Sequence, residues 1–311
     1  MMRHDDHFRE DEVQELHPKR VMGVGARGSV TLVRVHRDGS SFLAALKKPF
    51  AEDDEARGEF RTECAAFRKI APHPHVLRFL GFVVKTKAKP RKRRDDRSPL
   101  GALTDALDTC MWKALVSEES AEEWFPDPIT ASDTLGGVAR GLLHLHAHGY
   151  VHSDLRSPNV FLKKRREGVV AVVGDIGSVE LAEDPIHPEY ARNRRGFAHL
   201  AGDDTVMTPA VDVFSFGVLL AEAVVLRQHV DATEELSPFF RRGRVDAALL
   251  DAERLLDFAD VGHDDHDVRS RTKALCELME ECTRMDPRQR PDTETVLRRV
   301  LECSAAAKTI T

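Results

Sequence analysis

The chain has 311 residues, of which 41% are hydrophobic and 32% are charged, and its net charge at pH 7 is −6. This length suffices for one bilobal domain or two small domains, and the charge gives no general attraction to nucleic acid or to membranes. No apolar run approaches the roughly 20 residues that span a bilayer. Five scattered cysteines without a C-x-x-C pair favour a reducing compartment. We therefore expect a cytoplasmic protein that binds neither nucleic acid nor membranes; its oligomeric state stays unknown at this point.

The pattern along the chain predicts a small β-rich part followed by a larger helical part. Residues 1–16 are rich in histidine and acidic residues and predict a loose tail. Short apolar runs broken by glycine then predict strands, with Asp38-Gly39 as a hairpin turn. Later segments have helical spacing of apolar residues. The expected elements are strands over 20–24, 29–36, 41–46 and 76–84, and helices over 52–70, 132–148, 211–226, 270–284 and 293–303.

Residues 85–97 interrupt this pattern with eight lysine and arginine residues. A row of like charges makes a poor central strand. The functional interpretation is a nuclear-localisation signal or a patch for an acidic partner. The alternative, which we favour, is a solvated loop or a fault in the sequence, because such runs are usually solvated.

A glycine-rich segment opens the β-rich part. Gly23, Gly25 and Gly28, followed by Val30, fit the pattern G-x-G-x-x-G-x-V. Glycine lets the backbone approach phosphate oxygens, to which its N–H groups can donate. Dinucleotide-binding folds share such glycines, but there a helix follows, whereas a β-hairpin is predicted here. The segment therefore predicts a loop that binds nucleotide phosphates.

The third predicted strand carries a lysine that can reach the same phosphates. Because side chains alternate along a strand, Ala45 and Lys47 share one face and Lys48 points to the other. The small Ala45 leaves room for an adenine ring, and Lys47 beside it can contact the α- and β-phosphates. We therefore choose Lys47 over Lys48.

A glutamate in the next predicted helix can pair with this lysine. Glu63 and Glu59, one helical turn earlier, are the two candidates. We prefer Glu63 because Phe67, four residues later, shares its face and can pack inward. The pair would hold the lysine toward the phosphates.

The segment His152-Ser153-Asp154-Leu155-Arg156-Ser157-Pro158-Asn159 is followed by Asp175-Ile176-Gly177. An asparagine and an aspartate offer the oxygen ligands that Mg²⁺ prefers. The two motifs resemble H-R-D-L-x-x-x-N and D-F-G, in the order found in protein kinases. With the glycine-rich segment, 212–218, 282–291 and 73–76, the resemblance to the protein kinase superfamily runs over about residues 19–303. It is closest to the tyrosine-kinase-like group, whose members mostly phosphorylate Ser or Thr.

This resemblance implies an α+β bilobal protein kinase fold and ATP with Mg²⁺ as cofactors. Asp154 would accept the proton of the attacking hydroxyl, and Asn159 and Asp175 would hold the metal. Arg156 would contact the γ-phosphate, and Phe161 would line the adenine together with Val30 and Ala45. The kinase domain would cover 17–303, with lobes at 17–98 and 99–303 and a tail at 304–311.

Several positions differ from the family pattern. Ser153 replaces the arginine that balances a phosphate on the activation loop, so activity would not depend on phosphorylation there. The expected A-P-E glutamate is missing at 198–200, although 187–189 could replace it, and Arg290 would then lack its usual partner. The apolar fifth strand before the hinge is not evident, and 99–105 resembles the segment after the hinge.

The sequence thus predicts a protein kinase that transfers the ATP γ-phosphate to a protein hydroxyl, most simply of Ser or Thr. A pseudokinase that acts as an interaction scaffold is the second interpretation, and a small-molecule phosphotransferase is the third. His144 and His148, one helical turn apart, could chelate a metal, but surface or core histidines are the commoner case. Residues 263–267 are also rich in potential ligands and are interpreted as a solvated loop.

Overall fold

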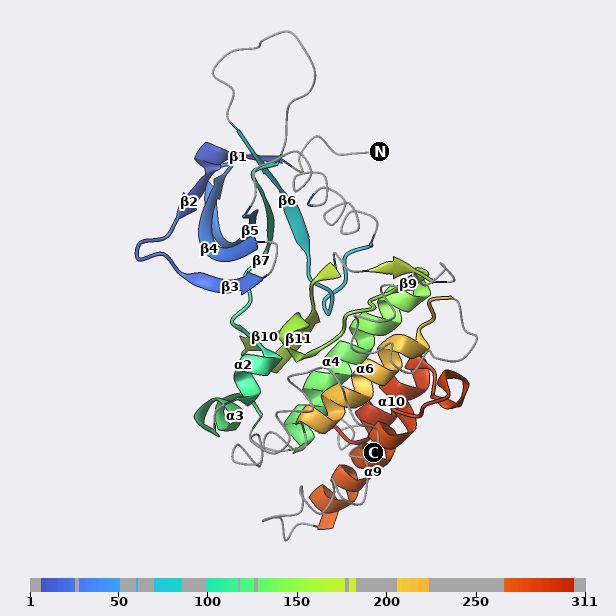
Figure 1. The fold of residues 1–311 in the computed structure, drawn as a ribbon. Helices are drawn as coiled ribbons and strands as arrows, with labels where there is room; N and C mark the ends of the chain where they lie inside the picture. Colours follow the sequence, from blue (N-terminus) through green and yellow to red (C-terminus); the bar gives the residue numbers. More distant parts are fainter. Residues whose placement is uncertain are drawn as a thin grey trace. The chain divides into compact units, whose positions relative to one another are not determined.

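A computed structural model describes residues 7–25, 28–50, 60, 70–85, 99–116, 118–125, 128–176, 179–182, 206–223 and 266–304. The chain divides into two compact units. The first comprises Met1–His73 and Leu77–Leu107, and the second comprises Pro74–Val76 and Asp108–Thr311. The predicted order of a β-rich part followed by a mostly helical part is confirmed (Figure 1). None of the described helices is long and apolar enough to cross a membrane.

A seven-stranded sheet forms most of the first unit. Its strands follow the order β1-β6-β7-β5-β4-β2, and β3 also pairs with β4. Strand β1 is parallel to β6, and the other pairs are antiparallel. The strands are β1 (His7–Arg9), β2 (Val13–Glu15), β3 (Val21–Gly25), β4 (Gly28–Arg37), β5 (Ser40–Pro49), β6 (Phe79–Val84) and β7 (Gly101–Asp105), with a 3₁₀ turn η1 (Glu10–Glu12) between β1 and β2.

The β4–β5 hairpin combines an alternating pattern of apolar residues in its strands with residues that favour a tight turn between them. Its turn places Asp38 and Gly39 at φ values of 50° and 76°, a left-handed conformation that glycine and aspartate tolerate. Val33 and Val35 of β4 are fully buried, as expected for one apolar face of a strand. They belong to a core cluster with Phe8, Ala44, Leu46, Val83 and Leu103.

The predicted loose tail over 1–16 is wrong for residues 7–15, which form β1, η1 and β2. Phe8 is only 4% exposed and Val13 packs against the same core cluster. Arg9, Glu10, Asp11 and Gln14 are exposed, which accounts for much of the polar composition of this segment. Phe8 and Val13 pack on the core, and the two strands pair with β6 and β4.

The expectation that the fifth strand is missing is also wrong. Strand β7 (Gly101–Asp105) pairs with both β5 and β6 and therefore occupies the central position of that strand. The first unit accordingly extends to Leu107, whereas the predicted lobe boundary was at 98. The basic run misled the prediction because it lies between β6 and β7 rather than inside a strand. Residues 86–98 themselves are outside the described part of the chain, as are 51–59 and 61–69 of the predicted 52–70 helix.

The second unit is mostly helical. It contains two small sheets, β11-β10-β8 and β12-β9. Its elements are β8 (Thr109–Cys110), α2 (Met111–Leu115), α3 (Glu118–Trp124), α4 (Pro128–Ala147), β9 (Tyr150–Val151), η2 (Ser157–Asn159), β10 (Val160–Arg165), β11 (Gly168–Val173), β12 (Glu180–Leu181), α6 (Ala210–Ala221), α9 (His266–Cys282), η6 (Pro287–Gln289) and α10 (Thr293–Glu302).

Helix α4 is central to this unit and contacts α6, α9, α10 and β11. Leu135, Val138, Leu142 and Leu145, at the predicted helical spacing, are at most 1% exposed. The predicted helix at 132–148 is confirmed, although α4 starts earlier, at Pro128. Gly149 follows the helix at φ 76°, a conformation in which glycine commonly ends helices.

Residues 74–76 belong to the helical unit although they lie between β-rich segments in the sequence. His75 Nδ1 is 2.8 Å from the carbonyl oxygen of Ala171, and the His75 carbonyl accepts a 2.9 Å hydrogen bond from Val173 N. A Cβ at Gly141 of α4 would lie 2.5 Å from the His75 carbonyl oxygen, so only glycine fits there. Burial, as the largest effect, lowers the pKa of His75.

Candidate active site

The segment that carries Asp154 connects β9 to η2 and is held by its own hydrogen bonds. Asp154 N donates to the carbonyl of His152 at 2.9 Å. Asn159 Nδ2 donates to the Asp154 carbonyl at 2.8 Å and to Asp154 Oδ2 at 3.1 Å. Ser153 between them has a φ of 62°, a strained value for a residue with a side chain, which occurs mainly at functional sites. The predicted base and the predicted metal-binding amide are therefore in direct contact.

The β10–β11 hairpin brings the Asp175 segment to the same place. Val160 pairs with Val173, so the residues just before β10 and just after β11 are neighbours. Gly174 N donates to the Asn159 carbonyl at 2.8 Å, and His152 Nε2 lies 2.7 Å from the Gly174 carbonyl. Asp175 follows at φ 53°. The structure therefore brings Asp154, Asn159 and the backbone of Asp175 together, as the two sequence motifs predicted.

Phe161 of β10 packs against the same segment. A Cβ added at Gly174 would overlap Phe161 Cε2 and Cδ2, so the ring fits only because residue 174 has no side chain. Phe161 therefore lies beside the residue that precedes Asp175, and its role at the adenine stays a prediction.

Asp212 accepts hydrogen bonds from the segment that carries Asp154, a role that the sequence analysis did not predict. It lies in the first turn of α6 and is completely buried. Its Oδ2 accepts from His152 N at 2.7 Å, and its Oδ1 accepts from Ser153 N at 2.9 Å. His146 of α4 contributes a third contact, with Nε2 at 2.8 Å from Oδ2. The sequence did contain a sign of this role, because Asp212 is a single acidic residue in an otherwise strongly apolar segment. A charge buried in such a helix needs hydrogen-bond partners.

The charge state of Asp212 follows from these contacts. Burial raises the pKa of this carboxyl, but the hydrogen bond and charge of His146, with further contributions from His152, outweigh it. The net result is a pKa below the ordinary value of 3.8, so the side chain is a carboxylate at neutral pH. His146 Nδ1 in turn lies 2.7 Å from Thr293 Oγ1, which links α4, α6 and α10.

Arg156 lies next to the predicted base. Its Nε is 3.6 Å from Asp154 Oδ2, and the two side chains are 41% and 31% exposed. Among the described residues, Nε has no hydrogen-bond partner, although it is itself shielded from solvent. The two side chains are therefore neighbours; the contact of Arg156 to the γ-phosphate stays a prediction.

The residues present fit Mg²⁺. Both hydrogen bonds of Asn159 to Asp154 use Nδ2, which leaves its Oδ1 as the atom that can serve as a ligand. Asp175 adds a carboxylate on the strained backbone beside it. Mg²⁺ usually takes one or two carboxylates and keeps water and substrate phosphates as its other ligands, so this small set suffices.

His144, near the end of α4, and His148, just after the helix, lie next to each other. The His144 and His148 rings lie 4.4 Å apart, and His148 Nδ1 is 2.7 Å from the His144 carbonyl. Among the described residues, no group of three or more His, Cys, Asp and Glu side chains could hold a metal. Residues 263–265 of the second ligand-rich segment are outside the described part.

In the first unit, the glycine-rich segment forms the β3–β4 hairpin. Gly23 lies opposite Val30, and Gly25 lies opposite Gly28. Residues 26 and 27 of the turn are not described. The predicted β-hairpin context of the glycines is thus confirmed, which separates this loop from dinucleotide-binding turns.

The predicted adenine and phosphate contacts share one face of this sheet. Lys47 lies directly opposite Val30 on β4 and opposite Ala102 on β7. Directly opposite residues of antiparallel strands point to the same side, and Ala45 lies two residues away on that side. Lys48 lies on the other face, where its Nζ donates to Glu15 Oε1 at 2.9 Å. The strand alternation that favoured Lys47 is therefore confirmed; its role stays a prediction.

Two of these glycines should respond differently to substitution. A Cβ at Gly28 would overlap the carbonyl oxygen of Lys48, which belongs to the paired backbone of β5, whereas a Cβ at Gly23 meets nothing within 4 Å. We expect Gly28→Ala to lower the melting temperature by several degrees, since overpacking costs about 1–3 kcal/mol. Gly23→Ala, the matched control, should melt within about 1 °C of the wild type. Equal melting temperatures for both variants would contradict this assignment, and differential scanning fluorimetry decides.

Other predicted site residues fall outside the described part of the chain. They are Glu63 and its competitor Glu59, Gly177, and both candidates for the A-P-E position, 187–189 and 198–200.

Arg290, predicted to pair with that glutamate, is only 8% exposed. Its guanidinium donates to the carbonyls of Arg284, Ala210 and Met285 at 2.8, 2.7 and 3.3 Å. Burial, the largest effect, lowers its pKa to about 10.

Comparisons with known proteins agree with this arrangement. The family model described as protein tyrosine and serine/threonine kinase matches residues 16–300. The human dual specificity testis-specific protein kinase 1 is 28% identical over 222 residues, which cover 68% of this chain and 32% of the relative. The Arabidopsis thaliana receptor-like kinase TMK4 is 28% identical over 284 residues, covering 88% of this chain and 28% of the relative.

A viral relative shows the same resemblance at lower identity. The tyrosine-protein kinase transforming protein ros of UR2 avian sarcoma virus is 26% identical over 243 residues, which cover 69% of this chain and 54% of the relative. The chain therefore spans about a third of the length of the first two relatives and about half of the third. Because the family model covers most of the chain, and the catalytic motifs fold together as they predict, this protein belongs to the protein tyrosine and serine/threonine kinase family.

Proposed function

We propose that this chain is an active protein kinase that transfers the γ-phosphate of ATP to Ser or Thr hydroxyls of proteins in a Mg²⁺-dependent reaction. The observation that supports the proposal is the set of hydrogen bonds that joins Asp154 to Asn159, and Asn159 to the backbone of Gly174, the residue before Asp175. Family membership supports the reaction class and a protein substrate.

Each predicted site residue has a separate role in the proposed reaction. Asp154 orients the substrate hydroxyl and takes its proton, and Asn159 holds Asp154 in place through Nδ2. Asn159 Oδ1 and Asp175 hold Mg²⁺, which neutralises charge on the phosphates. Arg156 contacts the transferred phosphate, and Lys47, oriented by Glu63, positions the remaining phosphates. Catalysis of this kind consists mostly of positioning and charge stabilisation.

A catalytically inactive scaffold is the second candidate, favoured by one observation. Ser153, only 5% exposed, occupies the place of the family's arginine. The argument from a missing hinge strand no longer applies, because β7 lies between β5 and β6. We therefore favour the active enzyme.

The test is transfer of radiolabelled γ-phosphate to peptides that offer Ser, Thr or Tyr, followed by phosphoamino-acid analysis. We expect label on Ser and Thr, and at least a hundredfold less with Asp175→Asn. The exposed carboxylate Asp38, at the β4–β5 turn, supplies the matched control Asp38→Asn, which should transfer label like the wild type.

Three results would change the assignment. Label on Tyr alone would contradict the Ser/Thr assignment. An absence of transfer together with an absence of thermal stabilisation by ATP and Mg²⁺ would favour the scaffold, since a ligand at 100 times its Kd stabilises by about 2.7 kcal/mol. Loss of transfer after phosphatase treatment would contradict independence from activation-loop phosphorylation.

A further inference from the structure

The N-terminal segment His7–Glu15 pairs with both outer regions of the sheet in the first unit. In the strand order, β1 and β2 are at opposite ends, although only the three residues of η1 separate them in sequence. Figure 1 shows β1 beside β6 and β2 beside β4. One segment of nine residues (His7–Glu15) therefore joins the two ends of the sheet, and we refer to it as the N-terminal clasp.

Phe8 anchors the first end of the clasp. Its backbone lies opposite Val83 of β6, and its side chain is 4% exposed. The ring belongs to the core cluster that contains Ala44 and Leu46 of β5, and the Arg37 guanidinium lies 4.6 Å from its centroid. The clasp thereby packs onto the face of β5 that carries Ala44 and Leu46.

Glu15 anchors the second end on the same strand. Its backbone lies opposite Val33 of β4, and its Oε1 accepts the 2.9 Å hydrogen bond from Lys48 Nζ. The hydrogen bond and the charge of Lys48 are the largest effects that lower the pKa of Glu15, so Glu15 is a carboxylate at neutral pH. Lys19, at 3.9 Å from Oε2, adds a weaker contact.

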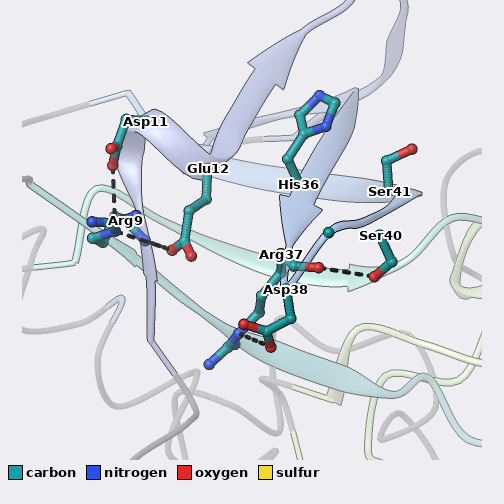
Figure 2. Close-up of a pocket in the computed structure, with 9 residues that line it drawn as sticks. Arg9, Asp11, Glu12, His36, Arg37, Asp38, Ser40 and Ser41 are labelled. Carbon is teal, nitrogen blue, oxygen red and sulfur yellow. Dashed lines mark hydrogen bonds and ion pairs between the residues drawn. The ribbon is translucent and has the colours of Figure 1, made fainter.

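Between these anchors the clasp borders an open hollow of about 550 Å³ (Figure 2). The charges that line it are paired locally, since Arg9 lies within 3.7 Å of Asp11 and Glu12, and Arg37 lies 3.9 Å from Asp38. None of these ion pairs joins the clasp to β5. The ion pair between Glu15 and Lys48, at 2.9 Å, does join the clasp to β5.

Side chains alternate along β5, so the contact of Glu15 with Lys48 on one face of the strand bears on Lys47 on the other face. Ala44, Leu46 and Lys48 share the face that the clasp covers, and Ala45 and Lys47 share the opposite face. We propose that Glu15 is a positioning residue: by holding Lys48 on the clasp side of β5, it keeps Lys47 in place on the nucleotide side, opposite Val30. This inference rests on the proposed function, because it assigns Lys47 to the phosphates of ATP.

The experiment compares the full chain with Glu15→Gln and with Glu10→Gln, an exposed glutamate of η1 that serves as the matched control. Steady-state kinetics give KM for ATP and kcat. Brief acylation followed by mass spectrometry gives the reactivity of the Lys47 and Lys48 amines without any nucleotide.

We expect Glu15→Gln to raise Lys48 acylation and KM for ATP by about two- to fivefold each, the effect that a partly exposed ion pair supports, and to leave kcat within about twofold. Exchange of the charges, Glu15→Lys with Lys48→Glu, should restore KM. Glu10→Gln should match the wild type in all readouts.

Each other result overturns a defined statement. Unchanged Lys48 acylation in Glu15→Gln overturns the clasp contact, whether or not the protein binds ATP. Increased acylation with unchanged KM shows that the contact exists but does not position Lys47, which overturns the positioning role. A wild type that neither binds ATP nor transfers phosphate contradicts the proposed function, and with it the catalytic part of this inference.

Discussion

Asp154→Asn is expected to lower kcat by about 10²–10⁴-fold, the usual contribution of a general base, while KM for ATP changes by less than about threefold. The amide has the shape of the carboxylate and can still accept the hydrogen bond from Asn159 Nδ2, which is 3.1 Å from Asp154 Oδ2 in the wild type. The variant therefore loses the proton acceptor and keeps the local structure. Steady-state phosphate transfer at saturating peptide measures both parameters.

The control for this variant is Asp38→Asn, which alters a carboxylate that is 95% exposed at a turn. It should have wild-type kcat. A kcat of Asp154→Asn within tenfold of the wild type would contradict the assignment of Asp154 as the base. Equal melting temperatures of the two variants would show that the loss is chemical rather than structural.

Asp212→Ala is expected to destabilise the second unit by about 3–5 kcal/mol, because it removes a fully buried carboxylate from its hydrogen-bond partners. Three N–H groups lose their acceptor: the backbone N–H groups of His152 and Ser153, and Nε2 of His146. Each unsatisfied buried donor costs about 1–3 kcal/mol. Chemical denaturation at pH 7 measures the change in the free energy of unfolding.

The pH dependence provides a second test of the same network. The pKa of Asp212 is below its ordinary value of 3.8 in the folded protein, so the unfolded state binds the proton more readily. The stabilisation is therefore present above the ordinary pKa and is lost as the pH falls toward the folded-state value. We expect the wild type to lose this contribution below about pH 4 and Asp212→Asn to lack that part of the slope.

Asp212→Asn also covers the case in which the alanine variant does not fold, because it keeps the volume of the side chain. Asp38→Asn again serves as the control and should keep the wild-type slope. An Asp212→Asn protein with unchanged stability and an unchanged acid slope would show that the carboxylate does not hold the Asp154 segment.

The motif residues of the second unit were predictable because their chemistry depends on short spacings. Asp154 and Asn159 are five residues apart, and the structure joins them by hydrogen bonds at 2.8 and 3.1 Å. The β10–β11 hairpin that brings Asp175 close to Asn159 was not among the predicted elements. Strand alternation likewise separated Lys47 from Lys48 correctly.

The clasp and β7 were mispredicted for a common reason. Residues 7–15 and 101–105 are short and contain few apolar residues, so their own sequences hardly favour a strand. Their order comes from neighbours that are distant in the chain, since β1 pairs with β6, β2 pairs with β4, and β7 fills the place between β5 and β6. Local pattern cannot reveal such pairing partners.

The role of Asp212 was hidden in a similar way. An acid in an apolar helix indicates a buried partner, but the partners are about 60 residues away, at His152, Ser153 and His146. Contacts of this kind depend on how α4 and α6 pack, which no local periodicity specifies.

The sequence alone thus identified the residue types of the proposed phosphate-transfer site, because glycine, lysine, aspartate and asparagine at these short spacings have few other uses in combination. Tertiary structure decided what holds them: Asp212 beneath the Asp154 segment, and the clasp behind the strand of Lys47. The physical reason is that catalytic groups are specified by their own chemistry, whereas their supports are specified by long-range packing and hydrogen bonding.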